Sequence, residues 1–257
     1  MERVLFYVRM MYMIIYIIIF ALGLAWGSFL NVVEWRTHAG TSWLGGRSQC
    51  PSCRTTIAWQ DLVPVMSFLL LGGKCRGCKK SISLQYPVVE LLMGLIAVVL
   101  WYFHGAPLLF MRDFAVVSIL ALIFITDLKY MYVHESFVLI TSAALFIIFG
   151  IFEWHSWDQM IVGAAVGAGF FLFQYLISRG KWIGRGDISI GALMGVVLGW
   201  SLVPIALLIA YILGACIEGT RVLMRKQHLK DCVAFGTYLT VGTFITMIGS
   251  LLQLYGG

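Results

Sequence analysis

Four cysteines lie in two short motifs of the same form. Cys50-Pro-Ser-Cys53 is followed, after 21 residues, by Cys75-Arg-Gly-Cys78. Four thiolates at this spacing can close a tetrahedron around zinc, and a site with four protein sulfurs leaves no open position for catalysis. Lysines and arginines beside the second motif favour the thiolate form. The sequence therefore predicts a structural zinc site, with a pair of reduced or redox-active dithiols as the alternative.

Two aspartates suggest a second kind of chemistry. Asp127 ends one apolar segment, and Asp187 begins another in the run Gly184-Arg185-Gly186-Asp187. Paired carboxylates that share a proton can hydrolyse a peptide bond, because the ionised one takes a proton from water while the other protonates the scissile carbonyl. Gly184 and Gly186 would let a backbone or a substrate strand approach closely. The predicted catalytic pair is therefore Asp127 and Asp187.

Taken singly, the same aspartates have structural interpretations. Asp187 fits a helix N-cap or a first-turn acid, and Asp127 fits a solvated interfacial carboxylate paired with Lys129. The remaining polar residues that could carry chemistry are interpreted as structural. Among these, we expect the acids Glu34, Glu90, Glu135 and Glu218 to be structural or interfacial, and Cys216 and Cys232 to be packing residues. We expect the histidines His104, His134, His155 and His228 to be solvated, while His38 lies in the polar loop with no spacing to a second ligand.

The elements that must position these groups are membrane helices. Of 257 residues, 61% are hydrophobic and only 12% are charged, whereas soluble domains carry about 25% charged residues. This composition excludes an ordinary soluble globule, a disordered chain and a secreted disulfide scaffold. At about 20 apolar residues per span, the chain is predicted to be an all-α polytopic membrane protein with about eight transmembrane helices.

The spans follow from the uncharged runs. The predicted spans are Met10–Val33, Val88–Phe103, Leu108–Thr126, Ser136–Phe152, Gln159–Ser178, Val233–Leu254 and the run Ile188–Ile217, which Gly199 to Pro204 divides into two short helices. The predicted domains are a first helix (1–33), a small zinc-binding domain that carries the four cysteines (34–86) and a membrane-embedded peptidase domain of about seven helices (87–257).

The distribution of positive charge predicts the topology. Loops 34–86, 127–135, 179–187 and 221–232 hold 15 of the 18 Lys and Arg residues. The positive-inside rule makes these loops cytoplasmic and puts both termini outside. Asp127 and Asp187 then lie at the same depth at the cytoplasmic face. No long basic stretch lies outside the membrane-flanking loops, so we expect no nucleic-acid partner.

With these residues in view, the chain resembles the type IV prepilin peptidases. The resemblance is carried by the segment from Cys50 to Leu91, with Asp61-Leu62-Val63-Pro64 and Tyr86-Pro87-Val88-Val89-Glu90-Leu91, by Gly27-Ser28-Phe29-Leu30-Asn31-Val32-Val33 with Arg36, and by Gly184-Arg185-Gly186-Asp187. It covers about residues 20–250. It implies an intramembrane aspartyl protease of the bacterial inner membrane that removes the leader from prepilins, pseudopilins or competence pilins.

The resemblance also implies a second activity, N-methylation of the new N-terminus with S-adenosylmethionine as methyl donor. The candidates for this activity are Gly27, Asn31, Arg36 and Asp61. Each also has a structural interpretation, namely helix packing, a buried hydrogen bond, an anchor at the inner face and a turn or cap. A peptidase without methyltransferase activity stays open, as do a zinc-stapled membrane scaffold and a transporter whose acids relay protons.

The chain departs from the family pattern at three places. His134-Glu135 stands where the first motif usually ends in Pro-Asp or Pro-Asn, and Ser189 stands where a Lys often follows the second aspartate. The late Pro-Phe-Gly-Pro segment reads Ala234-Phe235-Gly236-Thr237. We expect cleavage to survive these substitutions and the geometry beside the aspartates to change.

Overall fold

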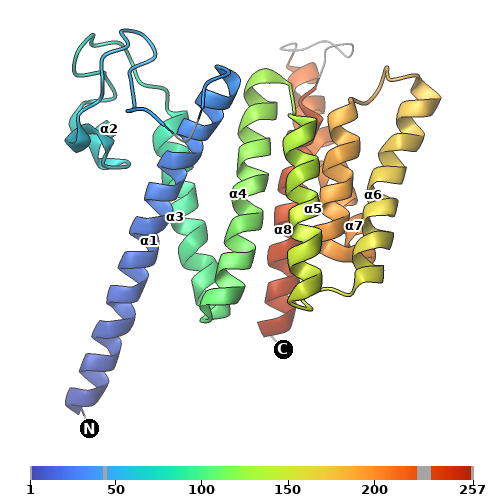
Figure 1. The fold of residues 1–257 in the computed structure, drawn as a ribbon, viewed down its shortest axis with the longest axis horizontal. Coiled ribbons are helices and arrows are strands. Elements are labelled where there is room, and N and C mark those ends of the chain that lie inside the picture. Colours follow the sequence, from blue (N-terminus) through green and yellow to red (C-terminus); the bar gives the residue numbers. More distant parts are fainter. Residues whose placement is uncertain (1, 43–44, 225–232, 256–257) are drawn as a thin grey trace. The chain divides into compact units, whose positions relative to one another are not determined.

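The protein is described by a computed structural model that covers residues 2–42, 45–224 and 233–255 (Figure 1). The chain divides into two compact units, residues 1–115 and 116–257. Within the described residues the regular structure is helical, and β-type pairing is confined to two isolated bridges in the cysteine segment. The predicted all-α fold is therefore confirmed.

The helices agree with the predicted spans to within a few residues at most ends. They are α1 (Glu2–His38), α2 (Met66–Leu70), α3 (Gln85–His104), α4 (Pro107–Tyr130), α5 (Glu135–Ile151), α6 (Trp157–Ser178), α7 (Arg185–Leu223) and α8 (Phe235–Tyr255), with a 3₁₀ turn η1 (Trp59–Leu62). Among the described residues, six of them are long and apolar enough to cross a membrane, and α5 is a shorter apolar helix. The chain is a polytopic membrane protein.

The long helix α7 consists of two helices that join at Gly199. This residue has φ 70° and ψ 166°, a conformation that is essentially restricted to glycine. The adjoining helix α6 shows that the chain turns back there. Gly163 near the start of α6 contacts Gly195 and Trp200, whereas Gln174 near its end hydrogen-bonds Tyr211. The arm 200–223 therefore runs back beside the arm 185–198, which confirms the predicted division and gives eight long helical segments in the described residues.

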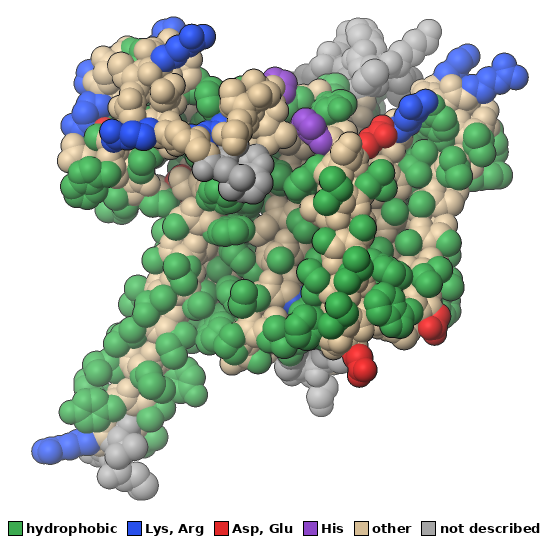
Figure 2. Space-filling model, viewed as in Figure 1, with side chains coloured by type: hydrophobic (Ala, Val, Ile, Leu, Met, Phe, Trp, Pro, Cys, Tyr) green, Lys and Arg blue, Asp and Glu red, His purple; other side chains and the backbone are tan. Residues whose placement is uncertain are grey.

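Close backbone approach holds each unit together. In the first unit, a Cβ at Gly27 of α1 would lie 2.7 Å from the Cα of Glu90 in α3. In the second unit, Gly167 of α6 lies directly against Gly191 of α7. Small residues at such crossings let membrane helices pack backbone to backbone, where the hydrophobic effect supplies little force. Figure 2 shows hydrophobic side chains along the lengths of the helices, the surface expected to face lipid.

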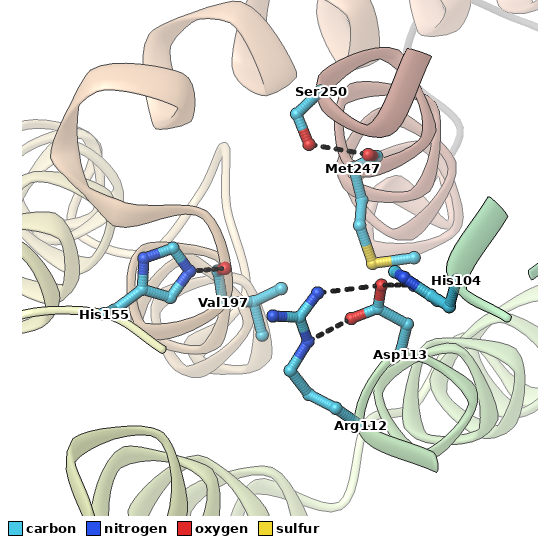
Figure 3. Close-up of polar contacts among 7 residues, drawn as sticks. All are labelled: His104, Arg112, Asp113, His155, Val197, Met247 and Ser250. Carbon is cyan, nitrogen blue, oxygen red and sulfur yellow. Dashed lines mark hydrogen bonds and ion pairs between the residues drawn. The ribbon is translucent and has the colours of Figure 1, made fainter. Parts of the chain in front are cut away.

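Two of the histidines predicted to be solvated are held by partners inside the protein. The side chain of His104, at the end of α3, is 1% exposed, and its Nε2 lies 2.7 Å from Asp113 Oδ2. Arg112 donates to the same carboxylate at 2.6 Å, which completes a cluster within the first unit (Figure 3). In the second unit, His155 Nε2 lies 3.1 Å from the carbonyl oxygen of Val197. The prediction was wrong for His104, whose side chain is buried against Asp113. His155 lies in a loop as predicted and is half-buried, with its ring held by the carbonyl of Val197.

Candidate aspartate pair and cysteine site

Asp127 lies in the last turns of α4 and is buried, with 5% of its surface exposed. Its Oδ2 accepts two hydrogen bonds from Thr237 in the first turn of α8, one from the backbone N–H at 2.7 Å and one from the hydroxyl at 3.1 Å. The first N–H groups of a helix have no partner within the helix, so a carboxylate is well placed there. The interpretation of Asp127 as a solvated partner of Lys129 was wrong, because α8 covers the carboxylate.

Asp187 is the third residue of α7 and is partly exposed. Its Oδ2 accepts a hydrogen bond from the backbone N–H of Gly184 at 3.1 Å. This contact satisfies an N–H group at the helix start, as the interpretation of Asp187 as a first-turn acid predicts. It engages one carboxylate oxygen only, so it does not compete with a second role for the other oxygen.

The two aspartates belong to the same end of the second unit, and their carboxylates are close enough to interact electrostatically. Figure 1 shows the end of α4 and the starts of α7 and α8 together at this end. Gly236 of α8 lies close to both α4 and α7. A Cβ at this residue would lie 3.0 Å from Asp127 Oδ2 and 2.9 Å from Ile190 Cδ1. The structure therefore brings together the two acids that the sequence singles out.

The glycines of the Gly184-Arg185-Gly186-Asp187 run differ in their surroundings. A Cβ at Gly186 would lie 3.0 Å from the Cβ of Val133, so this glycine allows the start of α7 to approach the loop that follows α4. A Cβ at Gly184 would lie 3.8 Å from Asp187 Oδ2, an ordinary contact distance. Gly186 is therefore needed for close packing against Val133, while Gly184 contributes its N–H group to Asp187.

Two residues beside the aspartates escaped the sequence analysis. Thr237 falls in the late segment that departs from the family pattern, but only the fold shows that it contacts a residue 110 positions away. Tyr211 on the returning arm of α7 interacts electrostatically with Asp187 and shares hydrogen bonds with Gln174 of α6 at 3.1 Å. An aromatic residue in an apolar run carries no local signal of such a position.

The four cysteines Cys50, Cys53, Cys75 and Cys78 gather at one point of the first unit. Their Sγ atoms all lie within 4.8 Å of one another, and those of Cys50 and Cys78 are 3.9 Å apart. A tetrahedral zinc ion with Zn–S bonds of about 2.3 Å places its sulfurs about 3.8 Å apart. The cysteines therefore fit a metal ion such as zinc without rearrangement of the fold.

The two motifs form equivalent turns around this point. The N–H of Arg54 donates to the carbonyl of Cys50 at 2.8 Å, and the N–H of Lys79 donates to the carbonyl of Cys75 at 3.0 Å. Arg54 and Lys79 both have positive φ, at 55° and 59°. Each turn thus curls its two thiols to the same side of the backbone, and the pair of turns supplies four ligands from two local motifs.

Local hydrogen bonds favour the thiolate form at two of the four cysteines. The hydroxyl of Thr55 lies 2.9 Å from Cys53 Sγ, and this bond lowers the pKa of the Cys53 thiol to about 6. Backbone N–H groups of Cys78 and Gly77 lower the pKa of the Cys75 thiol. At Cys78 the N–H of Lys80 lowers the pKa of the thiol, but desolvation and hydrogen bonds with the other three cysteines outweigh it and raise this pKa to about 11. Metal binding requires deprotonated thiols, so Cys53 and Cys75 are the two ligands whose thiolate forms these contacts favour.

The four candidates for methyl transfer fall into two groups. Gly27 and Asn31 lie one turn apart on α1 at its contact with α3, where Asn31 is fully buried and donates to the carbonyl of Tyr86 at 3.3 Å. Arg36 instead donates to carbonyls of the following loop, including Gly46 at 2.9 Å. Asp61 accepts two hydrogen bonds from Arg76, at 2.7 and 2.8 Å, which lower the pKa of the Asp61 carboxyl.

The contact of α1 with α3 also contains polar groups that the sequence analysis interpreted as structural or interfacial. Glu34 is fully buried, and its Oε2 accepts from Gln85 Nε2 at 3.2 Å. Gln85 Nε2 also donates to Asn31 Oδ1 at 3.3 Å. Glu90 is 6% exposed and accepts from the N–H of Val65 at 2.7 Å. These two acids are structural groups of the first unit. Of the two lone cysteines, Cys216 is exposed, and Cys232 lies outside the described residues.

These features define a helical membrane protein with a carboxylate pair at helix ends and a separate four-cysteine site. Comparison with known proteins agrees. Residues 21–104 match the family described as the bacterial peptidase A24 N-terminal domain, and residues 114–218 match the type IV leader peptidase family. The chain belongs to the type IV prepilin leader peptidase family, as the resemblance in its sequence indicated.

Several curated relatives are matched along nearly their whole length. A prepilin leader peptidase/N-methyltransferase of Bacillus subtilis (strain 168) is 28% identical over 240 residues, which cover 93% of this chain and 96% of the relative. Proteins of the same name from Stutzerimonas stutzeri and Aeromonas hydrophila are 31% and 30% identical, with coverage of 88% to 90% of this chain and 88% and 89% of the relatives. No solved structure matches the chain significantly.

Proposed function

We propose that this protein is an intramembrane aspartic endopeptidase that removes the leader from type IV prepilins, pseudopilins or competence pilins. The observation that carries the proposal is the arrangement of Asp127 and Asp187. Both carboxylates lie at one end of the second unit, and the described hydrogen bonds of each run through Oδ2. The Oδ1 atoms are thereby left for water and substrate. Membership of the family supports the same assignment.

The chemistry follows from the pair. A water molecule between the carboxylates loses a proton to the ionised aspartate while its oxygen attacks the scissile carbonyl carbon. The protonated aspartate donates its proton to the carbonyl oxygen, which gives a neutral tetrahedral diol. Breakdown of the diol breaks the C–N bond, and the departing nitrogen receives a proton from the pair. The products are a leader ending in a carboxyl group and a mature chain with a new amine.

The orientation of the protein is part of the proposal. Most Lys and Arg residues lie in loops 34–86, 127–135, 179–187 and 221–232, which include the cysteine segment and adjoin the two aspartates. The positive-inside rule assigns these loops to the cytoplasm. Both termini would then face outward from the bacterial inner membrane. A basic leader is retained on the cytoplasmic side by the same rule, so its cleavage site would meet the aspartate pair at that face.

Zinc is proposed as the structural metal of the cysteine site. Cys50, Cys53, Cys75 and Cys78 would hold it, and it would tie a segment with little core of its own into one conformation. Because four thiolates complete a tetrahedral site, the metal would take no part in hydrolysis. The domain division of 1–33, 34–86 and 87–257 accompanies this proposal, with the cysteine segment as the middle domain.

N-methylation of the new N-terminus is the second proposed activity, and a peptidase without it is the alternative. S-adenosylmethionine would supply the methyl group to the amine that cleavage exposes. Of the four candidate residues, Gly27 and Asn31 lie together in the polar contact of α1 with α3. Arg36 and Asp61 have hydrogen-bond partners in the loop segments, so their contribution would be to hold the segments in place.

The test is to incubate the purified protein in detergent with a prepilin and S-adenosylmethionine and to determine product masses. Loss of the leader together with one added methyl group establishes both activities, and loss of the leader alone leaves the peptidase. Asp127→Asn and Asp187→Asn should each abolish cleavage in a folded protein. Asp158→Asn is the matched control, because Asp158 is an exposed acid at the start of α6. Normal cleavage by either of the first two variants would refute the assigned pair.

A further inference from the structure

We infer that Thr237 is a positioning residue for Asp127, an inference that rests on the peptidase proposed above. Thr237 lies in the first turn of α8 and is 7% exposed. Its hydroxyl and its backbone N–H converge on the same atom, Oδ2 of Asp127, at 3.1 and 2.7 Å. Two donors from one residue fix the position of this oxygen, and hydrogen bonds to an ionised acceptor are the stronger ones. Both described hydrogen bonds of Asp127 therefore run through Oδ2.

The direction of this hydroxyl distinguishes Thr237 from the other threonines of its helix. Thr240, Thr243 and Thr246 are also buried, and their hydroxyls donate to carbonyls of α8 itself, at 2.8, 2.7 and 2.8 Å. Such bonds to a preceding turn are how hydroxyls are usually satisfied in helices that lie in lipid. Thr237 is at the start of the helix, where no preceding helical turn offers a carbonyl, and its hydroxyl reaches another helix instead.

The position of Thr237 is itself fixed by its neighbour. Gly236 has no side chain, and a Cβ at this residue would lie 3.0 Å from Asp127 Oδ2 and 2.9 Å from Ile190 Cδ1. The backbone of α8 can therefore approach α4 and α7 closely enough for the N–H of Thr237 to reach the carboxylate. Ile190 is three residues after Asp187, so the first turn of α8 lies against Asp127 and against the first turns of α7. Thr237 acts on the reaction through Asp127 and needs no contact with the substrate.

The residue at position 237 is also a departure from the family pattern. The late motif usually ends in proline, which has neither an N–H group nor a hydroxyl. Threonine supplies both donors at this position. Thr237, which departs from the family pattern, is therefore the residue that hydrogen-bonds Asp127.

The inference is tested by removing the hydroxyl while keeping the shape of the side chain. In Thr237→Val the backbone N–H remains and one charge-assisted bond to Asp127 is lost. We expect kcat for prepilin cleavage to fall about 10- to 100-fold, with KM changed less than about twofold because the substrate is not contacted. Thr237→Ser keeps the hydroxyl and should recover activity to within about threefold of the wild type.

A matched control separates positioning from helix stability. Thr243→Val makes the same change in a fully buried threonine of α8 whose hydroxyl bonds only Leu239, and it should leave kcat unchanged. Thermal unfolding in detergent identifies a variant that does not fold, and Thr237→Ala then replaces the valine variant. Wild-type kcat in Thr237→Val or Thr237→Ala, or failure of Thr237→Ser to recover activity, refutes the inference and leaves the peptidase standing. Failure of the wild type to cleave any prepilin refutes the proposed function, and the inference with it.

Discussion

The fit of Gly236 beside Asp127 gives a prediction whose size can be worked out from the structure. In Gly236→Ala, the new Cβ would lie 3.0 Å from Oδ2 and 3.2 Å from Cγ of Asp127. Ordinary van der Waals contact needs about 3.5 Å or more, so the carboxylate must move by roughly half an ångström. The Cδ1 atom of Ile190, at 2.9 Å, is the end of a flexible side chain and can turn aside.

The displacement should reduce catalysis more than stability. Catalytic groups must be held to within about 0.5 Å of their working geometry, and an error of about 1 Å can cost about 100-fold. A shift of half an ångström away from Gly236 therefore predicts a fall in kcat of about 10- to 100-fold. Overpacking costs about 1–3 kcal/mol, and the gain in helix propensity from glycine to alanine, about 0.5–1 kcal/mol, offsets part of it.

Two other glycines of α8 serve as controls for the same substitution. Gly249 has open space where a Cβ would be added, so Gly249→Ala should keep activity and stability. Gly242 packs against α7, where a Cβ would lie 2.5 Å from the carbonyl oxygen of Ala206, so Gly242→Ala should lower the thermal midpoint. Cleavage rates and melting curves of the three variants in detergent give the answer. Wild-type kcat in Gly236→Ala would show that this close contact does not set the position of Asp127.

Three further predictions concern the metal site and the helix packing. The protein should contain about one zinc ion per chain, and Cys53→Ser should lose it while Cys216→Ser keeps it, as elemental analysis would show; equal zinc in both variants would contradict the site. Gly167→Ala should cost about 1–3 kcal/mol of stability, because a Cβ there meets the backbone of α7. Gly169→Ala, with open space at the same helix, should be neutral in the same melting experiment. Gly199→Ala should cost about 1–3 kcal/mol, because φ of 70° with ψ of 166° is strained for alanine; an unchanged midpoint would argue against the reversal at this residue.

The sequence was sufficient to predict the helices because lipid imposes a single rule on them. A span must be long, apolar and hydrogen-bonded within itself, so uncharged runs mark it with little ambiguity. The same rule located the division of α7, since the glycine at 199 and the proline at 204 interrupt an otherwise uniform run. It misjudged the start of α1, which extends back to Glu2 through two arginines, because charged residues end a span without ending a helix.

The cysteine site was predictable for a different reason. Each Cys-x-x-Cys motif forms half of the site from a local turn, so the spacing of the cysteines alone predicts how the four thiols are arranged. Contacts between distant residues carried no such signal. His104 with Asp113 and Thr237 with Asp127 pair across helix ends. From the sequence, a residue at a helix end is predicted to be a loop residue. Only the packing of the helices shows which of these ends are buried.

The positions of the two aspartates at helix ends follow from the same constraint that makes the helices predictable. Inside a membrane helix every backbone N–H is already bonded to its own helix, so it has nothing to offer a buried carboxylate. The first turn is the exception, because its N–H groups have no partner within the helix. Asp187 uses the N–H of Gly184 at the start of α7, and Asp127 uses that of Thr237 at the start of α8. A pair of carboxylates that needs fixed donors is therefore confined to the depth at which helices begin.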